Sequence, residues 1–322
     1  MPTTPTTSTS STASTHISTP SGLQWFADLT SVVDDPGAWA REREDEGWDG
    51  VACADHYWLT RAKVTAFGHL WVTLATMAAA TRHVRLQPAF ANNLFRHPVE
   101  FAQASLSMQL VSHGRYEAGL GAGWLRDELD GTGQRFPDGR ERARRLREAA
   151  IIVRELVSGR PCRFEGEYYR VDVPALGDPD RMPPPLVASV GSPWTMRHVT
   201  PLVDQVELKM GRSTSGGGLD LAALGSVTID EVRRMIDTVR EAKPGVSVSV
   251  LVFVGCGTDA AARAPMAAMR AALGDGLYGS MIGEPAAVVA RLRGLAELGI
   301  DRLQVSQWVP GSFAALAPHL SG

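Results

Sequence analysis

The chain has 322 residues, of which 44% are hydrophobic and 21% are charged, and its formal net charge is −3. This length suits two average domains or one α/β barrel of about 250 residues, and the charge gives no basis for binding nucleic acid or an anionic membrane. Three distant cysteines, Cys53, Cys162 and Cys256, match neither a disulfide framework nor a zinc-ligand spacing, so a reducing cytoplasm fits best.

Residues 1–20 consist almost entirely of Ser, Thr and Pro. Such a segment cannot bury enough apolar surface to offset the entropy of ordering, and it lacks the cationic start and apolar centre of a secretory signal. We therefore expect a disordered tail over residues 1–20 and a single domain over residues 21–322. No apolar run approaches the roughly 20 residues that span a bilayer, so a cytoplasmic location is expected.

From residue 23 onward, β-rich runs alternate with longer helical patterns. The predicted strands are 23–27, 48–55, 83–90, 115–121, 185–190, 204–210, 246–255 and 301–308. The predicted helices are 36–46, 64–80, 98–111, 140–157, one opened by Pro193, 229–242, 258–273 and 284–298, with loops at 124–139 and 211–220. Eight strand–helix units predict a parallel sheet closed into a (β/α)8 TIM barrel. An open doubly wound sheet is the main alternative, but the first strand–helix turn has no G-x-G-x-x-G.

The stretch from Arg96 to Trp124 ends in an unusual strand, whose last residues are Gly119-Leu120-Gly121-Ala122-Gly123. Glycines let another group approach the main chain closely, so a flat ligand could lie on this strand end. A tight turn that only lets the next helix pack is equally compatible with these residues.

In an α/β barrel, functional residues gather at the C-terminal ends of the strands. The residues there are mostly aromatic or apolar, which is typical of a pocket for a flat organic molecule. They are Asp55, His56 and Trp58 after the second strand, Pro88, Ala89, Phe90 and Asn92 after the third, Gly121, Gly123 and Trp124 after the fourth, Gly191 and Ser192 after the fifth, and Trp308 after the eighth.

Among these residues, His56 can exchange protons or hydrogen-bond a bound ring, although a bond to loop backbone is the equal alternative. Asp55 is expected to orient or cap. Gly191 and Ser192 precede a helix and could seat a phosphate, or only start that helix. Glu117 is expected to pair inside the barrel with a cation such as Arg85 or Lys209. No H-E-x-x-H, G-x-S-x-G, Walker or EF-hand pattern occurs, so no metal site is predicted.

The segment FRHPVEFAQASLSMQLVSHGRYEAGLGAGW (95–124) resembles the central signature of the bacterial luciferase-like monooxygenase superfamily. The segment FPDGRERARRLREAAIIVRELVSGRPCRFEGEYYRVD (136–172) resembles its actinobacterial deazaflavin (F420)-dependent oxidoreductases. The resemblance implies a TIM barrel that binds F420, or alternatively FMN, at its C-terminal face. It places a bulge at Pro88-Ala89, where relatives have a non-proline cis peptide, His56 near the reactive face of the ring, and Gly191-Ser192 at the phosphate or ribityl chain.

These considerations together assign a catalytic role to His56. The expected cofactor-binding residues are Asp55, Pro88, Ala89, Gly121, Gly123, Gly191 and Ser192, and the expected substrate pocket is Trp58, Phe90, Asn92, Trp124 and Trp308. Sugar-phosphate dehydrogenases of the superfamily carry a glutamate just after the strand-four glycines. This chain has Trp124 there, so an apolar substrate is expected.

The resemblance implies hydride transfer between F420 and a small, largely apolar substrate. An FMN-dependent monooxygenase acting through a peroxyflavin, and a non-catalytic luciferase-like binding protein, are the alternatives. The expected partners are the small-molecule substrate, a flavin or F420 reductase that supplies reduced cofactor, and a second copy of the chain in a homodimer, without nucleic acid or membrane.

Overall fold

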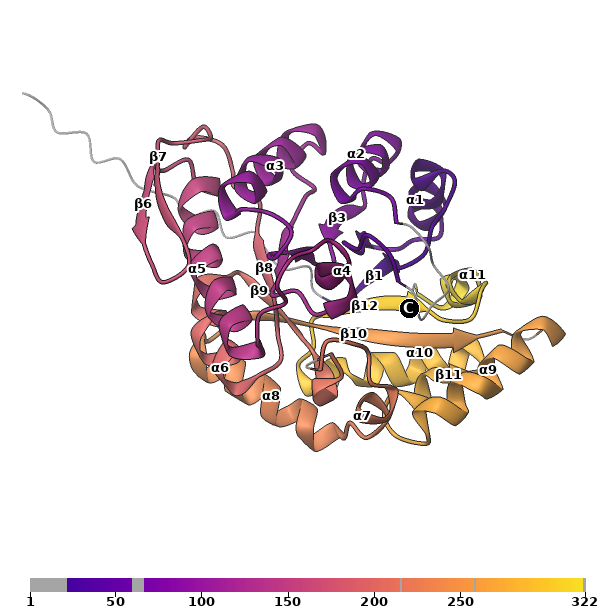
Figure 1. The fold of residues 1–322 in the computed structure, drawn as a ribbon. Helices are drawn as coiled ribbons and strands as arrows, with labels where there is room; N and C mark the ends of the chain where they lie inside the picture. Colours follow the sequence, from indigo (N-terminus) through magenta and orange to yellow (C-terminus); the bar gives the residue numbers. More distant parts are fainter. Residues whose placement is uncertain (1–21, 60–66, 215, 258, 321–322) are drawn as a thin grey trace, which may run out of the picture.

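Parallel strands form the wall of a barrel that helices cover on the outside (Figure 1). The computed structural model describes residues 22–59, 67–214, 216–257 and 259–320. Within this part of the chain, the wall consists of β1 (Gln24–Leu29), β2 (Gly50–Cys53), β3 (Arg85–Pro88), β5 (Ala118–Gly121), β8 (Leu186–Val190), β9 (Gln205–Leu208), β10 (Ser247–Cys256) and β12 (Arg302–Gln307). Each lies within one of the eight predicted strand segments or overlaps it, so the predicted (β/α)8 barrel is confirmed.

The wall closes at a seam between β3 and β5. The strand order is β3-β2-β1-β12-β10-β9-β8-β5, with the short β4 (Ala91–Asn92) paired to β5 and β11 (Ile282–Gly283) paired to β10. A single bridge joins the two ends, because the Leu86 N–H donates to Arg115 O (3.1 Å) and the Glu117 N–H donates to Leu86 O (2.9 Å).

The outer layer consists of helices that begin at clear sequence signals. They are α1 (Pro36–Asp45), α2 (Leu70–Ala80), α3 (Pro98–Val111), α5 (Gly139–Val157), α6 (Pro193–His198), α8 (Ile229–Ala242), α9 (Ala260–Leu273) and α10 (Pro285–Gly294). Proline opens α1, α3, α6 and α10, and side chains such as Asp138 and Thr228 accept the first free N–H groups of α5 and α8. Shorter helices are α4 (Arg126–Gly131), α7 (Leu221–Gly225) and α11 (Ser312–Leu316), with 3₁₀ turns at Thr200–Leu202, Met210–Arg212, Gly279–Met281, Ala296–Leu298 and Ala317–His319.

Several predicted boundaries are corrected by the structure. The predicted loop 124–139 contains α4, the segment 284–298 ends as an α-helix at Gly294, and the described part of 64–80 becomes helical at Leu70. Residues 60–66 and the predicted disordered tail 1–20 lie outside the described residues. None of the helices within the described ranges is both long and apolar enough to cross a membrane.

A hairpin of β6 (Cys162–Glu165) and β7 (Arg170–Val173) was not predicted. It is fastened to α5 by the buried carboxylate of Glu148, which accepts the backbone N–H groups of Glu167 (2.8 Å), Tyr168 and Tyr169 (both 3.0 Å). A side chain of α5, distant in the sequence, therefore accepts the free backbone N–H groups of the hairpin turn. A local sequence pattern does not reveal this contact.

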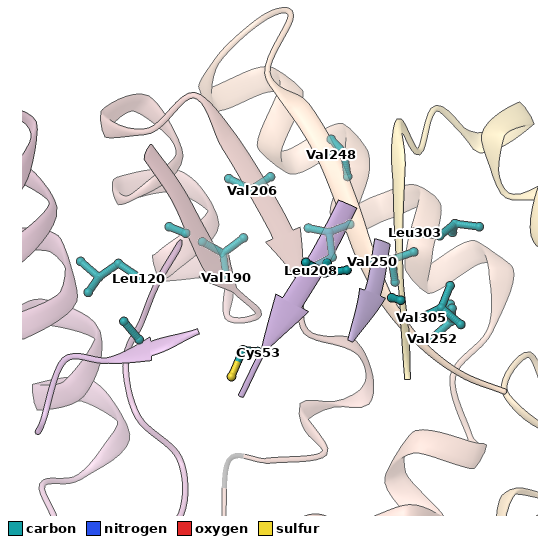
Figure 2. Close-up of a cluster of buried hydrophobic side chains, with 14 of the residues drawn as sticks. Cys53, Leu120, Val190, Val206, Leu208, Val248, Val250, Val252, Leu303 and Val305 are labelled. Atoms are coloured by element: carbon teal, nitrogen blue, oxygen red, sulfur yellow. The ribbon is translucent and has the colours of Figure 1, made fainter. Parts of the chain in front are cut away.

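The main hydrophobic core lies outside the barrel wall, between the strands and the helices. Alternate strand residues pack with helix residues in one buried cluster. Figure 2 shows some of them, namely Cys53, Leu120, Val190, Val206, Leu208, Val248, Val250, Val252, Leu303 and Val305. The residues between them in the strands face the barrel interior, and many of these are polar.

A charged network around Glu117 fills the barrel interior near the N-terminal ends of the wall strands. Arg302 donates to Glu117 (2.5 and 2.9 Å), Gln87 (2.9 Å) and Gln24 (3.0 and 3.1 Å), and Arg85 also pairs with Glu117. The prediction that Glu117 pairs inside the barrel is thus confirmed for Arg85. Its other suggested partner, Lys209, pairs with a different glutamate, Glu207.

Candidate functional site

A buried histidine–glutamate pair lies where β2 ends. The Nδ1 atom of His56 is 2.9 Å from Oε2 of Glu128, and the other Glu128 oxygen accepts the backbone N–H of Tyr57 at 2.5 Å. Both side chains are largely buried, at 10% and 0% exposed. Because the carboxylate can only accept, it places the proton of a neutral His56 on Nδ1 and leaves Nε2 as the basic nitrogen.

Glu128, the partner of His56, was not among the residues predicted for the site. It lies on α4, inside the segment that was predicted to be a polar loop. Its signal was available, because Asp127 and Glu128 stand where a first helical turn favours acidic residues. The spatial partner of His56, however, is 72 positions away in the sequence and could not be read from spacing.

Aromatic side chains surround the histidine. The rings of Trp124 and His56 meet edge-on, with centroids 5.3 Å apart and an interplanar angle of 85°, and Phe67 lies 5.6 Å from His56. Trp58 lies so close to Gly131 that a Cβ atom at that glycine would be 2.7 Å from its ring. The structure therefore brings His56 and Trp124 together and places Trp58 against the end of α4.

Asp55 has its carboxylate engaged by the protein itself. One oxygen accepts the Asn92 N–H (2.6 Å) and an Arg96 guanidinium N–H (2.5 Å), and the other accepts from Arg96 at 3.1 Å. Asp55 therefore fastens β4 and the loop that leads to α3 onto the end of β2.

The glycines in and just after β5 are covered by the segment from Pro88, the last residue of β3, to Asn92. A Cβ atom at Gly119 would lie 2.2 Å from Pro88 O, one at Gly121 would lie 2.9 Å from Phe90 Cβ, and one at Gly123 would lie 2.4 Å from Asn92 Oδ1. The close approach that these glycines permit is thus made by the Pro88–Asn92 segment. The non-proline cis peptide in this segment joins Ala89 to Phe90, one residue later than the expected Pro88-Ala89.

The expected phosphate seat at the start of α6 is internally hydrogen-bonded. The N–H groups of Gly191 and Ser192 donate to the Thr195 hydroxyl at 3.2 and 3.0 Å, and the Thr195 N–H donates to Ser192 Oγ at 3.1 Å. Gly191 also packs against Lys209, because a Cβ atom there would be 2.9 Å from Lys209 O.

Lys209 connects this part of the rim to the Phe90 segment. Its Nζ atom is 2.6 Å from Oε1 of the buried Glu207 and 5.2 Å from the centroid of the Phe90 ring. Trp308 lies at the end of β12, where it packs on Phe253 of β10 with the ring centroids 4.4 Å apart. The site residues therefore form two groups, one around His56 and the other around Phe90, with Trp308 on the β10–β12 side of the rim.

Two further observations bear on the location of ligands. A groove of about 750 Å³ lies between α1 and α2 on the outer layer, lined by residues such as Arg41, Trp71 and Val72, and it belongs to the helical surface. In the described part of the chain, no group of three or more His, Cys, Asp or Glu side chains is placed to hold a metal ion.

Comparisons with known proteins agree with this architecture. A family model described as luciferase-like monooxygenase matches residues 8–273. An F420-dependent glucose-6-phosphate dehydrogenase of Amycolatopsis mediterranei (strain U-32) is 27% identical over 214 residues, which cover 62% of this chain and 62% of that protein. An F420-dependent hydroxymycolic acid dehydrogenase of Mycobacterium tuberculosis (strain ATCC 25618 / H37Rv) is 33% identical over 159 residues, covering 48% and 43%. The matches thus span less than two thirds of these relatives.

Solved structures resemble nearly the whole chain. An F420-dependent secondary alcohol dehydrogenase in complex with an F420-acetone adduct superposes with a TM-score of 0.71 at 19% identity, covering 92% of this chain and 98% of that one. A long-chain alkane monooxygenase superposes with a TM-score of 0.72 at 14% identity, covering 93% and 91%. At these identities the likeness establishes the fold.

Proposed function

Because the chain belongs to the luciferase-like monooxygenase family, we propose that it is an F420-dependent oxidoreductase that acts on a small, largely apolar organic substrate. The match of the family model over residues 8–273 and the F420-dependent relatives support this proposal. The observation that carries it is the His56–Glu128 pair, because a buried, oriented imidazole beside aromatic rings is suited to proton transfer at a bound ring.

We propose that the residues around His56 and at the start of α6 hold a flat cofactor with an anionic tail. When bound, F420 would supply the ring that carries the hydride. His56 would exchange the accompanying proton at Nε2, while Glu128 holds Nδ1 and stabilises the charged imidazolium. The Thr195 hydroxyl would release the N–H groups of Gly191 and Ser192 to the tail. Asp55, Pro88, Ala89, Gly121 and Gly123 would shape the wall behind the ring.

The aromatic surroundings of His56 support the proposed substrate class. Trp124 presents its ring to His56 at 5.3 Å, at the position where the resemblance to sugar-phosphate dehydrogenases would place a carboxylate. An indole gives a phosphorylated sugar no charged or acidic partner, whereas it gives apolar contact area to an organic carbonyl or alkene. We assign Trp58, Phe90, Asn92 and Trp308 to the remaining wall of the substrate pocket.

Paired fluorescence titrations with F420 and FMN test the cofactor. We expect saturable F420 binding by the wild-type protein and by His56→Ala, with turnover lost only in the variant. Saturable binding of FMN alone would replace the proposal with a flavin-dependent monooxygenase, and binding of neither cofactor would support a non-catalytic binding protein. A His56→Ala variant that turns over like wild type would remove His56 from the mechanism.

We further propose that the chain acts as a cytoplasmic homodimer that receives reduced cofactor from a separate flavin or F420 reductase. Exposed apolar side chains on α2 and α3 support the homodimer, namely Val72 (65% exposed), Leu110 (58%) and Val111 (49%). Light scattering of the purified protein should give twice the mass of one chain, and Leu110→Glu should halve it.

A further inference from the structure

Asp28 and the ion pair of Glu207 with Lys209 lie in the barrel interior near the Phe90 segment, close enough for their charges to act on one another. Asp28 is the fifth residue of β1, Glu207 lies on β9, and Lys209 follows β9 directly. Asp28 and Glu207 are 3% and 0% exposed. Lys209 pairs with one Glu207 oxygen at 2.6 Å and lies against the face of the Phe90 ring. The cluster therefore connects the buried interior to the wall of the mouth.

Each carboxylate of this cluster has one oxygen that is poorly satisfied. Asp28 Oδ1 and Glu207 Oε2 are buried and have no hydrogen-bond partner among the described residues. Two ionised carboxylates and one ammonium would leave a net charge of −1 in a region shielded from water, which is unfavourable. A single proton removes this excess charge and adds a donor for an unpaired oxygen.

Within the described residues, the strands around the cluster offer it no second cation. On β12, Asp28 faces Gln304 and Ser306, which do not ionise near neutral pH. Burial, and after it the charge of Asp28, raises the pKa of the Cys53 thiol on β2. Burial, and after it the charge of Glu207, likewise raises the pKa of Tyr278. Arg302 and Arg85 are paired with Glu117 near the N-terminal ends of the strands. Lys209 is therefore the cation that compensates the two carboxylates.

The same surroundings shift the acidity of Asp28. Burial raises the pKa of Asp28 to about 7, the charge of Glu207 acts in the same direction, and Lys209 and Gln304 oppose it. Its proton is therefore gained or lost near neutral pH.

We propose that Asp28, Glu207 and Lys209 form a proton-binding site beneath the barrel mouth, and that this site takes up a proton when a negatively charged group binds in the mouth. The deprotonated cluster repels such a group, and protonation removes the repulsion. By linkage, the bound anion and the proton must favour each other equally. The proton site stands without the proposed function, whereas the coupled ligand rests on it.

Carboxyl-carbon NMR of the ligand-free protein tests the proton site. We expect one carboxyl group that titrates near pH 7 in the wild type, is absent in Asp28→Asn, shifts to higher pH in Lys209→Met and shifts to lower pH in Glu207→Gln. The exposed Asp230→Asn is the matched control and should leave the titration unchanged. If no carboxyl group titrates above pH 6, or if the group persists in Asp28→Asn, the site is refuted. Should Asp28→Asn fail to fold, the opposite shifts in the other two variants decide.

The coupling is tested by the affinity for FMN at pH 6, 7 and 8. We expect the affinity to fall severalfold more in the wild type than in Asp28→Asn, because ionisation of the FMN phosphate affects both proteins equally. Parallel pH profiles would overturn the coupling while the NMR result stands. If the protein does not bind FMN, the same comparison is made with F420. If it binds neither cofactor, the coupling is refuted together with the proposed function.

Discussion

Replacing Glu128 by Gln should reverse the tautomer of His56 while leaving the fold intact. Oε1 of Glu128 accepts the Tyr57 N–H at 2.5 Å, so the glutamine must keep its carbonyl oxygen on that side. Its NH₂ group then faces His56 Nδ1, which has to accept, and the ring proton moves to Nε2. The nitrogen that we propose as the base in the wild type becomes a donor.

The stability changes expected for Glu128→Ala and Glu128→Gln separate a structural role of Glu128 from a chemical one. Glu128→Ala removes the acceptor from Tyr57 N–H and from His56, and each buried unpaired donor costs about 1–3 kcal/mol, so the loss of stability should be about 2–6 kcal/mol. Glu128→Gln keeps both contacts in neutral form and should cost about 1 kcal/mol. A correctly placed general base contributes about 10²–10⁴ to the rate, and this factor should be lost in the glutamine variant.

Nitrogen-15 chemical shifts of the His56 ring report the tautomer directly, and urea unfolding reports stability. We expect a protonated Nδ1 in the wild type and a protonated Nε2 in Glu128→Gln, with kcat reduced and cofactor affinity retained. A Glu128→Gln protein with the wild-type ring shifts would refute the assignment of Glu128 as the group that orients His56. Wild-type turnover in that variant would refute the role of the tautomer in the reaction.

Three further outcomes follow from the contacts of the described residues. Gly119→Ala should destabilise the protein by about 1–3 kcal/mol in urea unfolding, because its Cβ would meet a backbone oxygen at 2.2 Å, whereas Gly294→Ala, with open space around it, should be neutral or slightly stabilising. Glu117→Gln should cost about 3–5 kcal/mol by breaking a buried ion pair. Burial raises the pKa of Glu117, but Arg302 and Arg85 outweigh burial and lower it below its usual value, so the wild type should lose this contribution as pH falls below about 4.3, and the variant should show a flatter acid limb. Glu148→Ala should increase amide hydrogen exchange at residues 167–169 without loosening the barrel, and unchanged exchange there would show that other contacts hold the hairpin.

The barrel could be predicted because its signals are local and repeated. Pro98 fixes the start of α3 by the restriction of its own ring, and the run 246–255 is apolar enough to specify β10 without reference to its neighbours. Hairpin β6–β7 and helix α4 were not predicted because contacts with segments distant in the sequence hold them. Glu148 binds the turn of the hairpin, and Glu128 is held by the loop that follows β2.

The candidate site was predicted as a set of residue types, and its contacts required the fold. His56 and Trp124 were both expected at the mouth, yet their edge-on contact depends on how two loops meet. The glycine run was interpreted as a surface for a ligand, whereas the structure shows the Pro88–Asn92 segment packed on it. The glycine spacing predicts where another group can approach the backbone closely. Which group does so depends on how the strands come together when the barrel closes.

The seam between β3 and β5 has fewer backbone hydrogen bonds than the other junctions of the barrel wall. Every other junction in the wall is a ladder of paired strands, but here one bridge at Leu86 and Tyr116 is followed by the Ala89–Phe90 bend before pairing resumes through β4. Local opening requires few hydrogen bonds to break at this junction, so it should be the first part of the wall to exchange its amide hydrogens. Because Phe90 on the β3 side packs against Gly121 on the β5 side, side-chain packing joins the two ends of the wall where backbone hydrogen bonds are few.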